Sequence, residues 1–121
     1  MIPKKQAKCA VLGYGSWATA IVKTLTVNHP HVNWLVLNDD ILQSLEERSH
    51  NIKYLPWCYL DKEFISPSKD INAVVRDVDV VILAMPSAFL TKFLEPLTES
   101  LRDKIVVSAV KGIIPGDYLT I

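Results

Sequence analysis

The chain has 121 residues, of which 50% are hydrophobic and 21% are charged, and its 13 basic and 13 acidic residues give a formal net charge of zero. This length suits one domain that buries a substantial core. The balanced charge gives no electrostatic reason to expect nucleic acid or an anionic membrane as a partner, and the longest apolar run, "VDVVILAMP", is too short to cross a bilayer.

Short apolar runs and helical patterns alternate in the first half of the chain. Residues 7–12 predict a buried strand, and apolar residues recur at helical spacing over 18–25. This helix is expected to end at Asn28-His29-Pro30, because a proline disfavours helical geometry in the residue before it. A second strand is predicted over 32–37. Asp39-Asp40 then suits the N-cap and first turn of a second helix, where negative charge is favourable.

The second half begins with a loop and then resumes the alternation. The stretch "NIKYLPWCYLDKEFISPS" predicts a loop over 51–68 with one short strand at 64–66, and a brief helix is expected over 71–77. Residues 78–85 are apolar without alternation, which is typical of a central parallel strand covered on both faces.

A further helix and strand complete the pattern. Pro86 and Ser87 open a helix with one apolar stripe, expected to break near Pro96, and the last strand is predicted over 104–110. Strands that alternate with helices call for parallel pairing and right-handed crossovers. The predicted fold is therefore α/β, with one doubly wound parallel sheet over residues 1–121 and strand order 3-2-1-4-5.

Two of the four glycines, Gly13 and Gly15, lie between the first strand and the first helix. With Ala18 they form G-x-G-x-x-A: the first glycine permits a tight turn, the second lets the backbone approach a pyrophosphate, and the small third residue lets helix and strand pack closely. Amides at the helix start would then face the phosphates. An ordinary turn is the alternative, but the strand before and the helix after favour a Rossmann dinucleotide-binding domain.

The stretch "LNDD" follows the second strand, about twenty residues beyond the glycine turn, where such domains read the adenosine ribose. An acid there can hydrogen-bond the ribose hydroxyls and repel a 2′-phosphate. Asn38 and Asp39 are therefore candidate cofactor-binding residues, and the cofactor is expected to be NAD or NADP, with NADH the easier to accommodate. The alternative is that Asp39 or Asp40 only caps the next helix, and the two roles can coexist.

Ligands of open parallel sheets lie beyond the carboxyl ends of the strands, which directs attention to two more junctions. In "AMPSAF", Pro86 stops the central strand and Phe89 could form a wall on the nicotinamide side. In "AVKGI", Lys111 is expected at the same edge beside Gly112, where a cation could hold a polar or anionic substrate. The alternative for Lys111 is a solvated surface lysine.

Histidines and cysteines suggest neither a metal site nor a disulfide framework. His29, His31 and His50 are not spaced with the cysteines as metal ligands, and they are expected at the surface. Cys9 belongs to an apolar run and Cys58 to a loop, so a reducing cytoplasm is the expected compartment.

Four motifs together resemble one known family. "VLGYGSWATAIVKTL", "NIKYLP", "DVDVVILAMPSAFL" and "VVSAVKGI" are similar, in order and spacing, to the N-terminal domain of bacterial-type NAD(P)-dependent glycerol-3-phosphate dehydrogenase, from about Lys8 to Pro115. The resemblance implies an enzyme that interconverts dihydroxyacetone phosphate and sn-glycerol 3-phosphate for phospholipid synthesis. It implies that Ser16 and Trp17 contact the cofactor and that Phe89 lies near the nicotinamide. It further implies that Lys111 contacts both cofactor and substrate.

The sequence departs from this family at three positions and in length. Ala18 replaces the usual third glycine, Asn38 stands where an Arg or His often favours NADPH, and Trp57 follows Tyr-Leu-Pro where Gly is usual. The resemblance implies a further helical domain with the phosphate-binding groups and the general-acid lysine, so no catalytic residue is assigned in residues 1–121. This fragment alone is expected to bind cofactor and catalyse little, and a homodimer through its apolar end is a further expectation.

Two other functions fit a single doubly wound domain. A stand-alone NAD(H)-sensing module would bind cofactor without chemistry; the short length favours it, whereas "VKGI" and the Tyr-Leu-Pro loop oppose it. The cofactor domain of another two-domain dehydrogenase, acting on a 3-hydroxy acid or a nucleotide sugar, would share the glycine turn and differ in its substrate.

Overall fold

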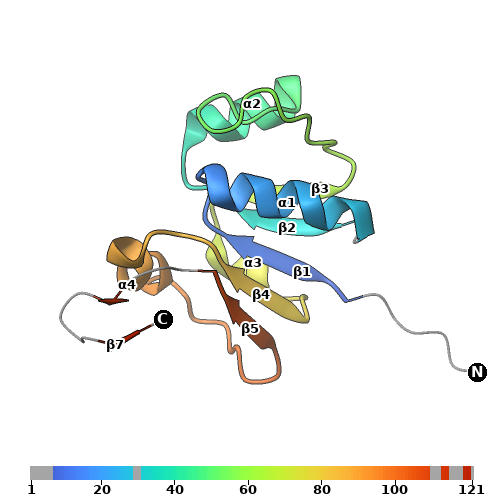
Figure 1. Cartoon of the computed structure of the whole chain (residues 1–121). Coiled ribbons are helices and arrows are strands. Elements are labelled where there is room, and N and C mark those ends of the chain that lie inside the picture. Colours follow the sequence, from blue (N-terminus) through green and yellow to red (C-terminus); the bar gives the residue numbers. More distant parts are fainter. Residues whose placement is uncertain (1–6, 29–30, 110–112, 115–118, 121) are drawn as a thin grey trace, which may run out of the picture.

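Parallel strands form the central sheet of the computed structural model, which describes residues 7–28, 31–109, 113–114 and 119–120 (Figure 1). The sheet contains β1 (Cys9–Leu12), β2 (Val32–Leu35), β3 (Ile65–Ser68), β4 (Val80–Leu83) and β5 (Ile105–Ser108). Their order is β3-β2-β1-β4-β5 and every pair is parallel, so the predicted topology is confirmed. A short antiparallel pair that the sequence did not predict consists of β6 (Ile113–Ile114) and β7 (Leu119–Thr120).

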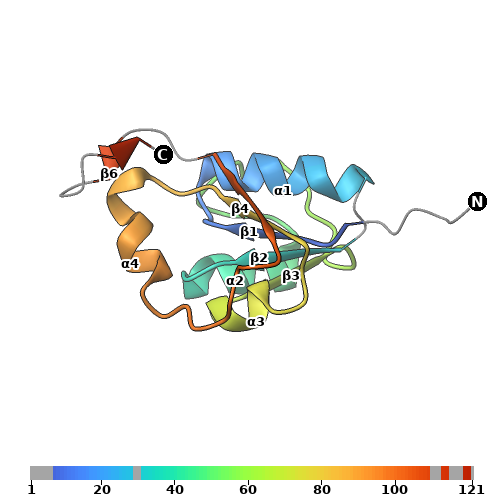
Figure 2. The same cartoon turned by 90° about the horizontal axis from the view of Figure 1, so that it is seen from below.

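Helices cover both faces of this sheet. They are α1 (Ser16–Asn28), α2 (Asp39–Arg48), α3 (Ile71–Val75) and α4 (Leu90–Leu94), and the 3-10 turn η1 (Ser87–Phe89) precedes α4. Figure 2 shows α1 and α3 on opposite sides of the sheet. Along β1, Ala10 and Leu12 join the core beneath α3 and α4, whereas Val11 joins the core beneath α1 and α2. Successive side chains of a strand point to opposite faces, so the central strand is buried twice, as its unbroken apolar run predicted.

The start of α2 corrects one expectation from the sequence. Asn38, and not an aspartate, is the N-cap: its backbone is extended, and its side-chain oxygen accepts a hydrogen bond of 3.1 Å from the Ile41 N–H. Asp39 and Asp40 occupy the first helical turn. An amide oxygen in the cap position satisfies an N–H group of the helix start, and the two carboxylates in the first turn interact favourably with the positive end of the helix dipole.

The segment after α4 shows why the predicted apolar stripe outlasts the helix. The helix ends at Leu94, because Pro96 cannot continue it. The following backbone is held by Asn72 of α3, whose Nδ2 donates to the Pro96 carbonyl at 3.2 Å and whose Oδ1 accepts from the N–H groups of Thr98 and Glu99. The later apolar residues of the stripe therefore still pack against the core from irregular backbone.

The two cysteines are free thiols in different surroundings. Cys9 on β1 is only 4% exposed, and burial, with a smaller contribution from the charge of Asp79, raises the pKa of its thiol. Cys58 lies half-buried in the loop before β3. Thiolate is the reactive form, so at neutral pH we expect an alkylating reagent to modify Cys58 first and Cys9 only as the chain unfolds. Mass spectrometry after timed labelling checks this order, and earlier labelling of Cys9 would contradict the burial of β1.

Among the described residues, none of the helices has the length and apolar character that crossing a membrane requires.

Candidate functional site

Gly13 forms the turn between β1 and α1, and its backbone leaves no room for a side chain. Its φ is 129°, a value that residues with a Cβ rarely adopt, and a Cβ there would lie 2.0 Å from the carbonyl oxygen of Ala84. The Gly13 carbonyl accepts a hydrogen bond of 2.6 Å from the indole nitrogen of Trp34, a fully buried residue of β2. The turn is therefore confined between the end of β4 and the Trp34 side chain.

Gly15 lies in the opposite kind of environment. A Cβ built on it would meet no heavy atom within 4 Å. Its carbonyl accepts hydrogen bonds from the Thr19 N–H at 2.9 Å and from the Thr19 hydroxyl at 2.7 Å, so Gly15 starts α1. The first amides of a helix have no partner within the helix, and the first turn of α1 contains no acidic side chain. Open space beside the positive end of a helix suits an anion such as a phosphate.

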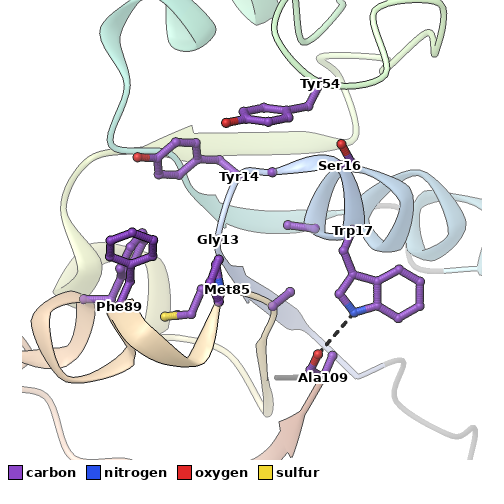
Figure 3. A pocket seen from close by; sticks show the side chains of 13 residues that line it. Gly13, Tyr14, Ser16, Trp17, Tyr54, Met85, Phe89 and Ala109 are labelled. Atoms are coloured by element: carbon purple, nitrogen blue, oxygen red, sulfur yellow. Dashed lines mark hydrogen bonds between the residues drawn. The ribbon is translucent and has the colours of Figure 1, made fainter. Parts of the chain in front are cut away.

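A cavity of about 640 Å³ lies beside this turn, within the size range of small-molecule sites (Figure 3). Six of the residues predicted to bind cofactor line it: Gly13, Gly15, Ser16, Trp17, Pro86 and Phe89. The other lining residues are Tyr14, Ala18, Tyr54, Ala84, Met85, Phe93 and Ala109. The walls are mostly apolar or aromatic, and they come from the glycine turn, the loop before β3, the end of β4 with the helix after it, and the end of β5.

Trp17 at the start of α1 and Tyr14 in the glycine turn connect these walls. The Trp17 indole nitrogen donates to the Ala109 carbonyl at 3.2 Å, which ties the start of α1 to the end of β5 (Figure 3). The Tyr14 ring lies 6.0 Å from the Phe93 ring, centroid to centroid, which packs the turn against α4. The carboxyl ends of β1, β4 and β5 thus share one cavity, as expected for a parallel sheet.

The acidic corner after β2 lies outside this cavity. Asn38 is occupied as the cap of α2. The Asp39 carboxylate lies 2.9 Å from the Lys69 ammonium, and the Asp40 carboxylate lies 4.0 Å from the Lys53 ammonium. Both pairs are exposed, so each contributes little to stability. The corner combines two carboxylates with two ammonium groups at the carboxyl end of the strand next to β1.

Lys111 and Gly112, the predicted substrate contacts, lie outside the described residues. Ala109 precedes them in the described part of the chain and lines the cavity.

Sequence reasoning missed the polar residues that support the glycine turn. Thr19 and Asn51 are fully buried, and both hydrogen-bond to the turn or to each other. Asn51 begins the motif "NIKYLP", and a polar side chain at the start of that motif was an available signal. Tyr14 and Tyr54 were also missed as lining residues. Both lie in loops, and the sequence does not indicate toward which surface an aromatic side chain in a loop is directed.

The chain is similar to one family of known proteins. Residues 8–121 match the family described as NAD-dependent glycerol-3-phosphate dehydrogenase N-terminus. The chain is similar to proteins named glycerol-3-phosphate dehydrogenase [NAD(P)+] from Halalkalibacterium halodurans, with 30% identity over 93% of the chain, and from Pseudomonas aeruginosa, with 32% identity over 90%. It spans 32% of the length of each of these relatives.

A solved structure supports the fold as well. The glycerol-3-phosphate dehydrogenase of Plasmodium falciparum superimposes with a TM-score of 0.82 at 24% identity, over 92% of this chain and 34% of that one. With the family match over nearly the whole chain and relatives at 30% identity or more, the conclusion is direct. The chain belongs to the NAD-dependent glycerol-3-phosphate dehydrogenase family and corresponds to its N-terminal part.

Proposed function

We propose that this chain binds a nicotinamide adenine dinucleotide, with the pyrophosphate against Gly15 and the start of α1. The observation that carries the proposal is the contrast between the two glycines. Gly13 is closed off by the end of β4, whereas Gly15 opens onto free space beside the first amides of a helix. A pyrophosphate needs that close approach to backbone and that positive helix end.

The aromatic and apolar walls provide the rest of the fit. Pro86, Phe89 and Met85 lie on the β4 side of the cavity, where a flat nicotinamide ring could pack. Ser16 and Trp17 lie in the first turn of α1 and line the same cavity. These side chains would orient the ring and keep water from it. When bound, the dinucleotide supplies or accepts the hydride.

The match to part of a longer enzyme supports a specific reaction for the whole protein. We infer that it transfers a hydride between NAD(H) or NADP(H) and the pair dihydroxyacetone phosphate and sn-glycerol 3-phosphate. In this proposal the described residues bind and orient the cofactor, Lys111 contacts both cofactor and substrate, and Gly112 contacts the substrate. The general acid lies outside residues 1–121. The family match favours this function over a sensing module or a dehydrogenase of another substrate class.

The cytoplasmic location and the homodimer remain predictions. Exposed apolar side chains on β5, at the edge of the sheet, support the homodimer.

Calorimetric titration of the chain with NADH and, separately, with NADPH tests the proposed function. Saturable binding at one site per chain is expected for at least one of them. Absence of heat and of any change in tryptophan fluorescence with both would contradict the proposal.

The acidic corner predicts the cofactor preference. In this proposal the 2′-phosphate of NADPH would lie near Asp39, so NADH is expected to bind more tightly than NADPH. Asp39→Asn removes the repulsion and leaves Lys69, now 2.9 Å from a neutral group, available to a phosphate. We expect the NADPH affinity to rise about fivefold relative to that for NADH, a gain of about 1 kcal/mol.

Asp77→Asn is the matched control for charge. Asp77 is exposed between α3 and β4, at the opposite end of the strands, and the same change of charge there should leave the preference between cofactors unaltered. Competition titrations of both variants measure the ratio, and an equal change in both variants would exclude a local role for Asp39.

A further inference from the structure

The side chain of Asn51, in the loop after α2, is fully buried and uses all of its hydrogen-bonding capacity. Its Nδ2 donates to the Tyr14 carbonyl at 3.1 Å and to the Thr19 hydroxyl oxygen at 3.0 Å. Its Oδ1 accepts from the N–H groups of Lys53 and Tyr54, both at 3.1 Å. One amide group therefore joins the glycine turn to the loop that follows α2.

The bond to Tyr14 determines how the peptide between Tyr14 and Gly15 is turned. In a trans peptide the carbonyl and the next N–H point in opposite directions. Because the Tyr14 carbonyl is held on Asn51, the Gly15 N–H is directed away from Asn51, and Gly15 borders the cavity. Asn51 thus orients, from the side away from the cavity, the amide that would meet the phosphates in the proposed function.

Thr19 extends the same support to the other side of Gly15. Its hydroxyl accepts from Asn51 and donates to the Gly15 carbonyl at 2.7 Å. Both carbonyls that flank the Gly15 amide are then held by one buried network, and neither Asn51 nor Thr19 is exposed to water. Water cannot replace a lost partner there, so each bond matters more than it would at the surface.

The acceptor side of Asn51 shapes the cavity itself. The Tyr54 ring lines the cavity, and the Tyr54 N–H is one of the two groups bound by Oδ1 (Figure 3). The other, Lys53, extends its ammonium to within 4.0 Å of Asp40 in the acidic corner. The same side chain that orients the glycine turn therefore fixes the loop between the cavity and the acidic corner.

We propose that Asn51, acting with Thr19, is a positioning residue that holds the glycine turn in the conformation that binds a pyrophosphate. The proposal rests on the proposed function, because it names what that turn requires in order to hold the cofactor. Asn51 does not touch the ligand; it acts through the carbonyls of Tyr14 and Gly15.

The test compares ligands with and without a pyrophosphate. Asn51→Leu is neutral, has a similar shape, and removes all four hydrogen bonds. We expect the affinities for NADH and ADP to fall at least about tenfold, and the affinity for adenosine, measured by NMR titration, to change less than about twofold. The Gly15 amide resonance of the ligand-free chain should also shift, because its peptide is no longer held.

Asn72→Leu is the matched control. Asn72 also holds three backbone groups of a neighbouring segment. It lies at the start of α3, and the segment that it holds follows the end of α4, away from the cavity. Its replacement should lower the unfolding midpoint and leave the ratio of ADP to adenosine affinity within about twofold of the unmodified chain. A loss of stability alone therefore does not imitate the expected result.

A second pair of variants decides the matter if Asn51→Leu does not fold. Thr19→Val removes the hydroxyl and keeps Asn51, so a threefold to tenfold loss of ADP affinity is expected, about 1 kcal/mol. Thr19→Ser keeps the hydroxyl and should bind ADP like the unmodified chain. Unchanged ADP affinity in folded Asn51→Leu or in Thr19→Val, or an equal loss for adenosine, would overturn the positioning role alone. Failure of the unmodified chain to bind NADH, NADPH and ADP would overturn the proposed function, and this inference with it.

Discussion

Gly13→Ala is expected to lower the free energy of unfolding by about 3 kcal/mol or more, a large fraction of the roughly 5 to 15 kcal/mol of an ordinary domain. The added Cβ would lie 2.0 Å from the Ala84 carbonyl oxygen and 2.7 Å from its carbon, so the backbone of β1 or β4 must move. The φ of 129° adds strain that no movement of a side chain relieves. Urea denaturation followed by far-UV circular dichroism measures the loss.

The same substitution two residues later is the control. Gly15→Ala meets no atom within 4 Å, and as the residue before α1 it should cost about 1 kcal/mol or less. Similar unfolding midpoints for the two alanine variants would show that the end of β4 does not confine Gly13 and would contradict the described geometry.

Gly15→Val is expected to weaken NADH binding at least about 100-fold, a loss of about 2.7 kcal/mol, while the chain stays folded. Two methyl groups would fill the space that the ligand-free structure leaves open at Gly15, which is where we propose the pyrophosphate lies. Folding does not need that space, so the effect should appear in binding and not in stability. Calorimetry with NADH and a thermal unfolding curve of the same sample separate the two.

Ala73→Val serves as the control for added methyl groups. Ala73 is exposed on α3 and does not line the cavity, so this variant should bind NADH like the unmodified chain. Gly15→Ala should lie between the two, because one methyl group occupies part of the space. If Gly15→Val binds NADH with unchanged affinity, the pyrophosphate does not lie at this glycine and the proposed site is wrong.

The two glycines thus illustrate different demands of one short motif. Gly13 serves the fold, and we propose that Gly15 serves the ligand; the pattern G-x-G-x-x-A predicts a tight turn at the first and a close approach of the ligand at the second. The structure supplies the measurable distinction: a backbone oxygen 2.0 Å from one Cβ position and open space at the other.

The acidic corner and the N-cap of α2 show where local pattern was insufficient. Asp39 and Asp40 were expected at the N-cap and in the first turn of the helix. Both lie in the first turn, but Asn38 is the N-cap, because the cap depends on which residue has extended backbone when β2 ends at Leu35. Element boundaries depend on pairing with neighbouring strands, which a single sequence does not contain. Lys69 comes beside Asp39 only because β3 pairs with β2.

Sequence pattern alone predicted the alternation of strands and helices, the strand order, the glycine turn and six residues of the cavity wall, because hydrophobic period and glycine placement are local signals. The support that Asn51 and Thr19 give to that turn is visible only in the folded chain. Their hydrogen bonds reach across 37 and 32 residues from Asn51 to Tyr14 and Thr19, and such contacts exist only after the sheet has brought the loop after α2 against the start of α1.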